Sequence, residues 1–206
     1  MIEFLSKGGV LVTPILFCSV LALAIFLERL IRFFSLSRKE VGLADRIAGY
    51  LINGEDEKAL KAVSAGESPQ GRVLSQALEV RHQDRETLET VISHAVEEEV
   101  RGISRYLPAL ATIGNIAPML GLLGTVIGMI KAFMVIQQMG GKVNAAVLAG
   151  GIWEAMLTTA LGLAVALPTL VAHSYLGSRV DKFEAGLQHG SITFLKAVYR
   201  NRRTEN

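Results

Sequence analysis

The chain has little cysteine chemistry available to it, because it contains one cysteine among 206 residues. Cys18 lies inside an apolar run, and there is no second cysteine with which it could form an intrachain disulfide. The sequence also contains no CxxC pair, no Cys/His cluster, no HExxH motif and no Gly-rich phosphate loop. We therefore expect no metal site, no cofactor and no enzymatic activity.

Charge is also scarce. Charged residues make up 19% of the chain and the formal net charge is +2, which leaves no basic footprint for nucleic acid. Half of the residues are hydrophobic. High apolar content with few charges is typical of a small polytopic membrane protein, whose partner is the lipid bilayer.

Three segments are long and apolar enough to cross a bilayer as helices, which requires about 20 residues each. We place them at residues 10–34, 107–130 and 145–177. The first segment has no basic stretch before it and no small-residue cleavage site, and its basic residues follow the apolar run. It is therefore predicted to be a retained anchor and not a signal peptide.

Basic residues near the span ends predict the orientation. One side of the membrane carries most of them, and the other side carries only Lys7, Lys131 and Lys142. The predicted topology is an N-terminus (1–9) and a loop (131–144) that face away from the cytoplasm, with a cytoplasmic helical segment (35–106) and a cytoplasmic C-terminal helix and tail (178–206). The basic residues assigned to the cytoplasmic side are Arg29, Arg32, Arg38, Lys39, Arg101, Arg105, Arg179, Lys182, Lys196, Arg200, Arg202 and Arg203.

The cytoplasmic segment has helical periodicity. Residues 40–65 predict a short helical hairpin that turns at Asn53-Gly54, and a new helix is predicted near Ser68 with Pro69 in its first turn. From Gly71 the apolar spacing continues into the second span, which predicts one long helix. The acidic cluster at residues 97–99 is interpreted as a solvated face rather than a partner site. The fold class is thus all-α, with second and third spans that extend into the cytoplasm.

The second span carries small residues at helical spacing. Gly114, Gly121 and Gly128 are seven residues apart, and Ala117, Pro118, Gly124 and Thr125 lie in the intervening turns. Such a stripe lets helix backbones approach closely in a membrane. Thr125 has two interpretations: its hydroxyl bonds back to its own helix, which the spacing favours, or it faces a pore.

Glu154 is the only acidic residue between Glu99 and Asp181. A carboxylate at bilayer depth costs several kcal/mol and is tolerated facing a protein interior or a wet cavity, so it is a candidate for proton or cation transfer. Thr158 and Gly162 share its helix face and Thr159 lies one position round. The alternative is a buried structural cluster. Trp153 is interpreted as an interfacial anchor, Pro168 as a kink and His173 as an interfacial histidine.

Two motifs resemble those of the ExbB/TolQ/MotA family: APMLGLLGTVIGM at residues 117–129, and GIWEAMLTTALGL at 151–163 followed by VALP at 165–168. Glu28-Arg29-Leu30, at the end of the first span, also fits the family. The resemblance implies that Thr125, Glu154 and Thr159 are pore-lining polar residues and that Pro118 is the second-span proline. With Thr158 from the helix-face argument, these residues form the predicted ion pathway. The packing and pore-lining residues are Gly114, Pro118, Gly121, Gly124, Gly128 and Gly162.

The resemblance further implies an inner-membrane motor-stator channel driven by the proton motive force. The family forms pentamers around a dimer of a single-span partner, ExbD or TolR, and passes work to TonB or TolA. The short N-terminus departs from ExbB proteins that have an extended periplasmic segment. The alternative function is a non-conducting scaffold of an envelope complex. Whether protons or sodium ions are used does not follow from the sequence.

Overall fold

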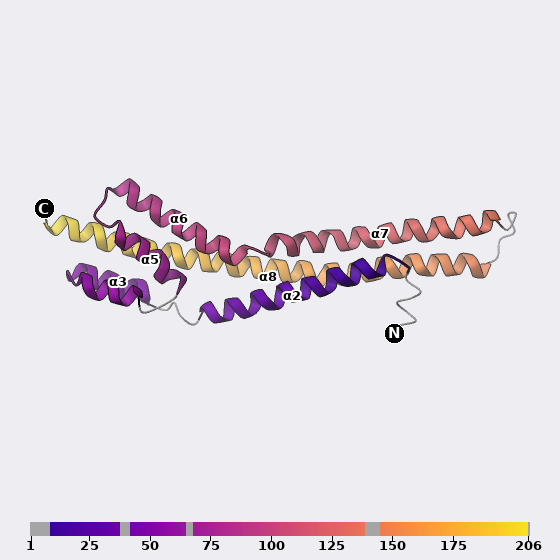
Figure 1. The fold of residues 1–206 in the computed structure, drawn as a ribbon, viewed down its shortest axis with the longest axis horizontal. Coiled ribbons are helices and arrows are strands. Elements are labelled where there is room, and N and C mark those ends of the chain that lie inside the picture. Colours follow the sequence, from indigo (N-terminus) through magenta and orange to yellow (C-terminus); the bar gives the residue numbers. More distant parts are fainter. Residues whose placement is uncertain (1–8, 38–41, 65–67, 139–144, 206) are drawn as a thin grey trace. The chain divides into compact units, whose positions relative to one another are not determined.

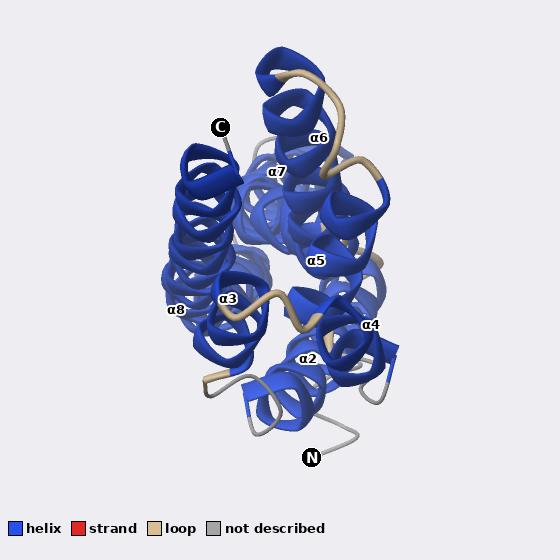
Figure 2. Ribbon diagram, turned by 90° about the vertical axis from the view of Figure 1, so that its left-hand side faces the viewer, coloured by secondary structure: helices blue, strands red, loops and turns tan. Residues whose placement is uncertain are grey.

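The computed structural model describes residues 9–37, 42–64, 68–138 and 145–205, and the elements in these ranges are helices (Figure 1). No strand occurs in the described ranges (Figure 2). This confirms the predicted all-α class. The helices are α2 (Val12–Ser37), α3 (Leu43–Ile52), α4 (Asp56–Ser64), α5 (Pro69–Glu79), α6 (Arg85–Ser104), α7 (Leu107–Gln138) and α8 (Ala145–Glu205).

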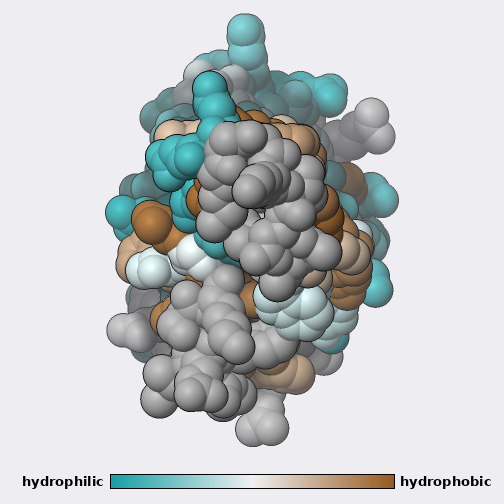
Figure 3. Space-filling view, turned by 90° about the vertical axis from the view of Figure 1, so that its right-hand side faces the viewer, coloured by the Kyte–Doolittle hydropathy of each residue, from teal (hydrophilic) through white to brown (hydrophobic). Residues whose placement is uncertain are grey.

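Three stretches of helix are long and apolar enough to cross a membrane: Val12–Phe34, Arg85–Gln138 and Leu148–Asn201. Each contains one of the three predicted spans or most of it. Since a bilayer removes the need to bury apolar surface within the protein, large hydrophobic side chains on these helices stay exposed, among them Phe17 and Met119. Figure 3 faces the end at which α7 ends and α8 begins, and hydrophobic surface is visible there in brown.

The chain divides into two compact units, which are described separately. Unit 1 comprises Met1–Glu28 and Tyr106–Tyr175, and unit 2 comprises Arg29–Arg105 and Leu176–Asn206. Unit 1 therefore contains α2 up to Glu28, α7 and the first half of α8. Unit 2 contains α3 to α6 and the second half of α8.

The helical hairpin predicted in unit 2 is confirmed. α3 ends at Ile52 and α4 begins at Asp56, with a turn at Asn53 and Gly54 between them. Gly54 has a φ of 71°, a left-handed conformation that glycine adopts at no steric cost. The amide of Glu55 then donates to the Tyr50 carbonyl at 2.9 Å and closes the turn.

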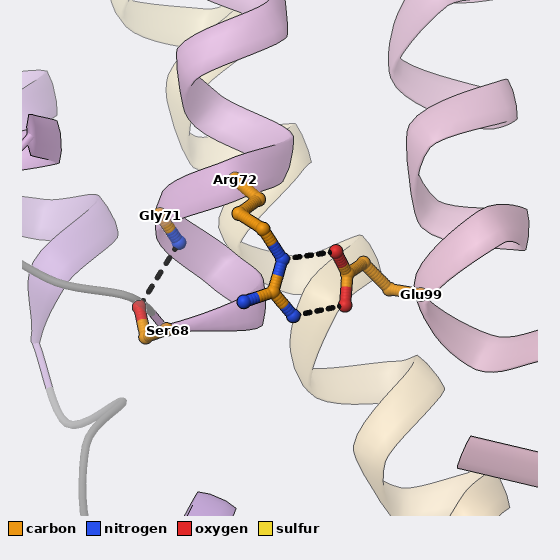
Figure 4. A network of polar contacts seen from close by, with 4 residues as sticks. All are labelled: Ser68, Gly71, Arg72 and Glu99. Carbon is orange, nitrogen blue, oxygen red and sulfur yellow. Dashed lines mark hydrogen bonds and ion pairs between the residues drawn. The ribbon is translucent and has the colours of Figure 1, made fainter. Parts of the chain in front are cut away.

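Side-chain caps define where the next two helices begin. The Ser68 hydroxyl accepts the Gly71 amide at 3.0 Å, with Pro69 at the first helical position, as predicted (Figure 4). Asp84 caps α6 in the same way and accepts the Thr87 amide at 2.9 Å. Because this backbone hydrogen bond favours the ionised carboxylate, the pKa of Asp84 lies below its ordinary value.

Unit 2 has a core of large apolar side chains contributed by five helices, and α8 contributes Leu187 and Phe194 to it. Ion pairs at the surface of unit 2 link segments that surround this core. Arg72 binds Glu99 through two contacts of 2.5 Å, which join α5 to α6 (Figure 4). Arg81 binds Asp56 at 2.6 Å. The acidic cluster at 97–99 is thus a solvated face only in part, because Glu99 serves as an interhelical partner.

The prediction of one long helix from Gly71 through the second span is wrong at residues 80–84, where the chain turns and Asp84 starts a new helix. From Arg85 to Gln138 the chain is one long stretch of helix, as predicted, with a short interruption at residues 105–106. Pro108 explains this interruption, because it has no amide to donate to the Ser104 carbonyl and its ring clashes with that oxygen.

α7 is longer than predicted, and α8 extends beyond the third span as predicted. α7 continues to Gln138, eight residues into the segment 131–144 that was predicted as a loop. Its residues 132–136 are apolar and continue the apolar run of the second span beyond Lys131. α8 runs unbroken through Pro168 to Glu205, so the third span and the C-terminal helix are one element. The sides of the membrane assigned to these segments stay a prediction, and residues 139–144 lie outside the described residues.

Arg29 has a structural role in addition to its predicted role as one of the basic residues that set the orientation in the membrane. Its side chain is 1% exposed, and its Nη1 donates to the carbonyls of Gly102 and Ile103 at 3.2 and 2.9 Å. These carbonyls belong to the last turn of α6, where helix geometry leaves oxygens without an intrahelical donor. Arg29 thus supplies a C-terminal cap from a helix distant in sequence.

We predict that Arg29→Ala destabilises the protein by about 1–3 kcal/mol, because two carbonyls lose their donor. The measurement is the free energy of unfolding in mild detergent, followed by circular dichroism. Arg32→Ala is the matched control: Arg32 is exposed on the same helix, and its substitution should change stability by less than about 0.5 kcal/mol. Equal stability of the two variants would contradict the capping role.

A charged pair between closely packed transmembrane helices

α7 and α8 approach each other in unit 1 through residues without bulky side chains. A Cβ placed on Gly162 would lie 2.6 Å from the Ala117 carbonyl oxygen, and one placed on Gly121 would lie 3.0 Å from the Thr159 Cα. These are main-chain atoms, which cannot rotate away. A Cβ at Gly162 therefore requires the facing backbone to move, and one at Gly121 requires a shift of a few tenths of an ångström. The helices pack backbone against backbone, as small-residue stripes allow.

The same contact continues toward the end of α7. A Cβ on Gly128 would lie 3.2 Å from the Gly151 carbonyl and from Ala155 Cβ, and one on Gly151 would lie 2.6 Å from Ala132 Cβ. Small residues on both helices thus keep the backbones close up to the level of Glu154. Gly151 and Ala132 belong to this contact but were not predicted as packing residues.

All five predicted packing glycines contact the facing helix of the same chain. Gly114 faces Leu170 and Gly124 faces Thr158, in addition to the contacts of Gly121, Gly128 and Gly162. Pro118 lies within α7 and is half-buried. The pore-lining role of these residues stays a prediction.

Thr158 and Thr159 converge on one carbonyl of α7. The Gly121 oxygen accepts the Thr159 hydroxyl at 3.0 Å and the Thr158 hydroxyl at 3.4 Å, and Thr158 also donates to Ala155 at 2.8 Å. Thr158 is 2% exposed and lies against Gly124. These hydroxyls join the two helices, while Thr159 is only partly buried.

Thr125 bonds back to its own helix, the interpretation that the spacing favoured. Its hydroxyl donates to the Leu122 carbonyl at 2.6 Å, and the residue is half-buried. A hydroxyl that donates its proton to a carbonyl still has lone pairs for a cation or water. Thr125 thus keeps acceptor capacity in this arrangement.

Glu154 forms an ion pair that the sequence analysis missed. Its Oε1 atom lies 2.9 Å from Lys131 Nζ, which comes from α7 and not from the same helix. The backbone of Gly9 lies against the same oxygen, so that a Cβ on Gly9 would overlap it. In the sequence analysis Lys131 served only as one of the few basic residues on the side opposite the cytoplasm. Sequence spacing gave no signal for the pair, because 23 residues and a helix reversal separate its members.

The pair is isolated from other charge. Among the described residues of Tyr106–Tyr175, Lys131 and Glu154 are the only side chains with a formal charge at pH 7. No group of three or more potential metal ligands occurs among the described residues. The arrangement therefore offers one carboxylate and one ammonium group, with the hydroxyls of Thr158 and Thr159 about one helical turn further along α8.

Three long apolar helices and a charged pair between two of them define a multi-pass helical membrane protein. Comparison with known proteins identifies its family. The sequence profile of the MotA/TolQ/ExbB proton channel family matches residues 65–189. The chain belongs to this family.

Individual relatives agree with the family match. The biopolymer transport protein ExbB of Salmonella typhimurium is 34% identical over 185 residues, covering 84% of this chain and 74% of the relative. An ExbB homologue of Methanothermobacter thermautotrophicus is 30% identical over 181 residues, which cover 87% of this chain but 64% of the relative. The Tol-Pal system protein TolQ of Haemophilus influenzae is 37% identical over 91 residues, or 44% of this chain and 39% of the relative.

We predict that Gly162→Ala destabilises the contact between α7 and α8 by about 1–3 kcal/mol, because the new methyl group meets the Ala117 carbonyl. Gly150→Ala is the matched control on the same helix, since a Cβ there has no neighbour within 4 Å. It should be neutral or stabilising by up to about 1 kcal/mol. The measurement is the thermal unfolding midpoint of the two purified variants in detergent. The packing role would be refuted if Gly162→Ala unfolded at the same temperature as Gly150→Ala or at a higher one.

Proposed function

We propose that this protein is an ion-channel subunit of a motor-stator complex in the inner membrane, driven by the proton motive force. The observation that carries the proposal is the position of Glu154, a partly exposed carboxylate in an apolar helix that packs backbone against backbone on α7. A charge at such a place is costly to retain, and family membership supplies a use for it. We propose no enzymatic activity for this site.

The proposed ion pathway passes Glu154 and uses hydroxyl oxygens of the threonines as further acceptors. Thr125 and Thr159 are partly exposed and retain lone pairs, which supports their inclusion. Thr158 is included from its place on the helix face of Glu154. Because it is buried against Gly124 and its hydroxyl donates to Ala155 at 2.8 Å, we propose that it acts through the packing of α7 on α8.

The proposed partners follow from the family. Homologues named ExbB and TolQ support an assembly with a single-span protein of the ExbD or TolR kind and an energy transducer of the TonB or TolA kind. A ring of chains, five by family resemblance, would line a pore that one chain with a single carboxylate lacks. The work would serve outer-membrane transport or envelope maintenance.

The second candidate is a non-conducting scaffold, and one observation favours it. The ion pair of Lys131 and Glu154 links α7 to α8, and a residue with a purely structural role would make the same contact. In that case Glu154 would matter for assembly and not for ion movement.

We predict that Glu154→Gln leaves assembly intact and abolishes activity. Glutamine keeps the size of the side chain and still accepts a hydrogen bond from Lys131, but it cannot ionise. The measurement is growth of a deletion strain carrying the variant under conditions in which the strain without the gene fails, together with co-purification of the single-span partner.

The control for this experiment is Glu184→Gln, the same chemical change on the same helix, at a residue that accepts from Gln188. It should retain activity. A scaffold predicts the opposite pattern at Glu154, with wild-type activity for glutamine and loss of assembly for Glu154→Ala.

We also propose that the N-terminus is periplasmic and the C-terminus cytoplasmic, because basic residues cluster after the first and third spans. A single cysteine introduced near the C-terminus in a Cys18→Ala background tests this. It should react with a membrane-impermeant maleimide only after the inner membrane is opened. Reaction in intact spheroplasts would reverse the topology.

A further inference from the structure

The Glu154 carboxylate already has a cation bound to it, and that cation is part of the chain. Lys131 Nζ lies 2.9 Å from Oε1, a direct contact without intervening water. The Gly9 backbone lies on the same oxygen, so two neighbours limit the space around it. The side chains of Lys131 and Glu154 are 51% and 25% exposed, so the packing of α7 on α8 leaves the pair only partly covered.

A metal cation at this carboxylate would have to displace the ammonium group. Small metal cations such as Na⁺ prefer oxygen ligands, and a carboxylate is their strongest ligand here. The ammonium group competes for the same oxygen as a tethered ligand, since the packing of α7 on α8 fixes its distance. Tethering converts its binding into an intramolecular step with a high effective concentration.

We propose that Lys131 is a specificity-determining residue, which occupies the cation position at Glu154 and keeps Na⁺ and similar metal cations from binding there. The inference deepens the proposed function in one respect, because it concerns which ion passes the Glu154 site. It accounts for the presence of a second charge in a segment in which each charge is costly. Without Lys131, the same carboxylate becomes a site for a small metal cation.

The test measures Na⁺ binding to the purified chain, with no partner protein and no ion gradient. The thermal unfolding midpoint in detergent is compared in sodium chloride and in choline chloride of equal ionic strength. Wild type and Lys131→Arg should unfold at the same temperature in both salts. Lys131→Gln should be stabilised by Na⁺, by about 3 °C or more once Na⁺ exceeds its Kd tenfold. Lys131→Met serves as a second variant if the glutamine variant does not fold.

Two controls assign the effect to the carboxylate. The variant that combines Lys131→Gln with Glu154→Gln should lose the Na⁺-dependent shift of the unfolding midpoint. Lys182→Gln, which removes one exposed positive charge from α8 far along the chain from Glu154, should show no such shift. The proposal is overturned if Lys131→Gln and Lys131→Met each unfold at the same temperature in sodium chloride and in choline chloride. It is also overturned if wild type is stabilised by Na⁺ as much as Lys131→Gln, or if the stabilisation by Na⁺ persists in the variant that combines Lys131→Gln with Glu154→Gln.

Failure of this inference is distinguishable from failure of the proposed function. The Na⁺ shift is a property of the isolated chain, whereas the proposed function depends on the activity of Glu154→Gln in cells. A Na⁺ shift in Lys131→Gln together with full activity of Glu154→Gln would leave the site specificity standing and remove the channel role.

Discussion

The close approach of α7 and α8 is the constraint on which the candidate site depends. At Gly162 and Gly121 the neighbouring atoms of the facing helix are main-chain atoms, so the distance between the helices is set by backbone contact. Two consequences follow from this distance. The Gly121 carbonyl comes within reach of two threonine hydroxyls, and Lys131 comes within reach of Glu154. A larger residue in the stripe would separate the polar partners as well as the backbones.

The two units are organised for different solvents. In unit 1 the small residues face the helix contact and large residues such as Leu122, Met156 and Leu167 are exposed, as expected where lipid replaces water around the protein. In unit 2 the pattern is reversed: Leu74 and Phe194 are fully buried, and charged residues lie on the surface. The stability of unit 2 can therefore come from the hydrophobic effect, whereas unit 1 depends on packing and hydrogen bonds.

Much of the fold was predictable from the sequence, because long apolar runs and short cap signals act locally. The hairpin turn at Gly54 and the start of α5 at Ser68 followed from residue type alone. The helix ends near Asp84 and Pro108 carried usable signals that the continuing apolar spacing obscured. The ion pair of Glu154 and the burial of Arg29 were not predictable, since both join residues that only the packing of distant helices brings together.

Lys131 changes how the isolated carboxylate is to be interpreted. A lone acid in an apolar span points to function because its charge has no compensation. With an ammonium group at 2.9 Å the pair is formally neutral, and part of the cost of the carboxylate is offset without any ion from solution. The pair by itself therefore does not argue for a channel, and it suits a strut equally well. The pair agrees with the proposed function in one respect, because half of the Lys131 side chain is exposed and the packing of α7 on α8 does not enclose the ammonium group. An accessible pair can exchange its partner, and partner exchange at a carboxylate is the elementary step of ion transfer.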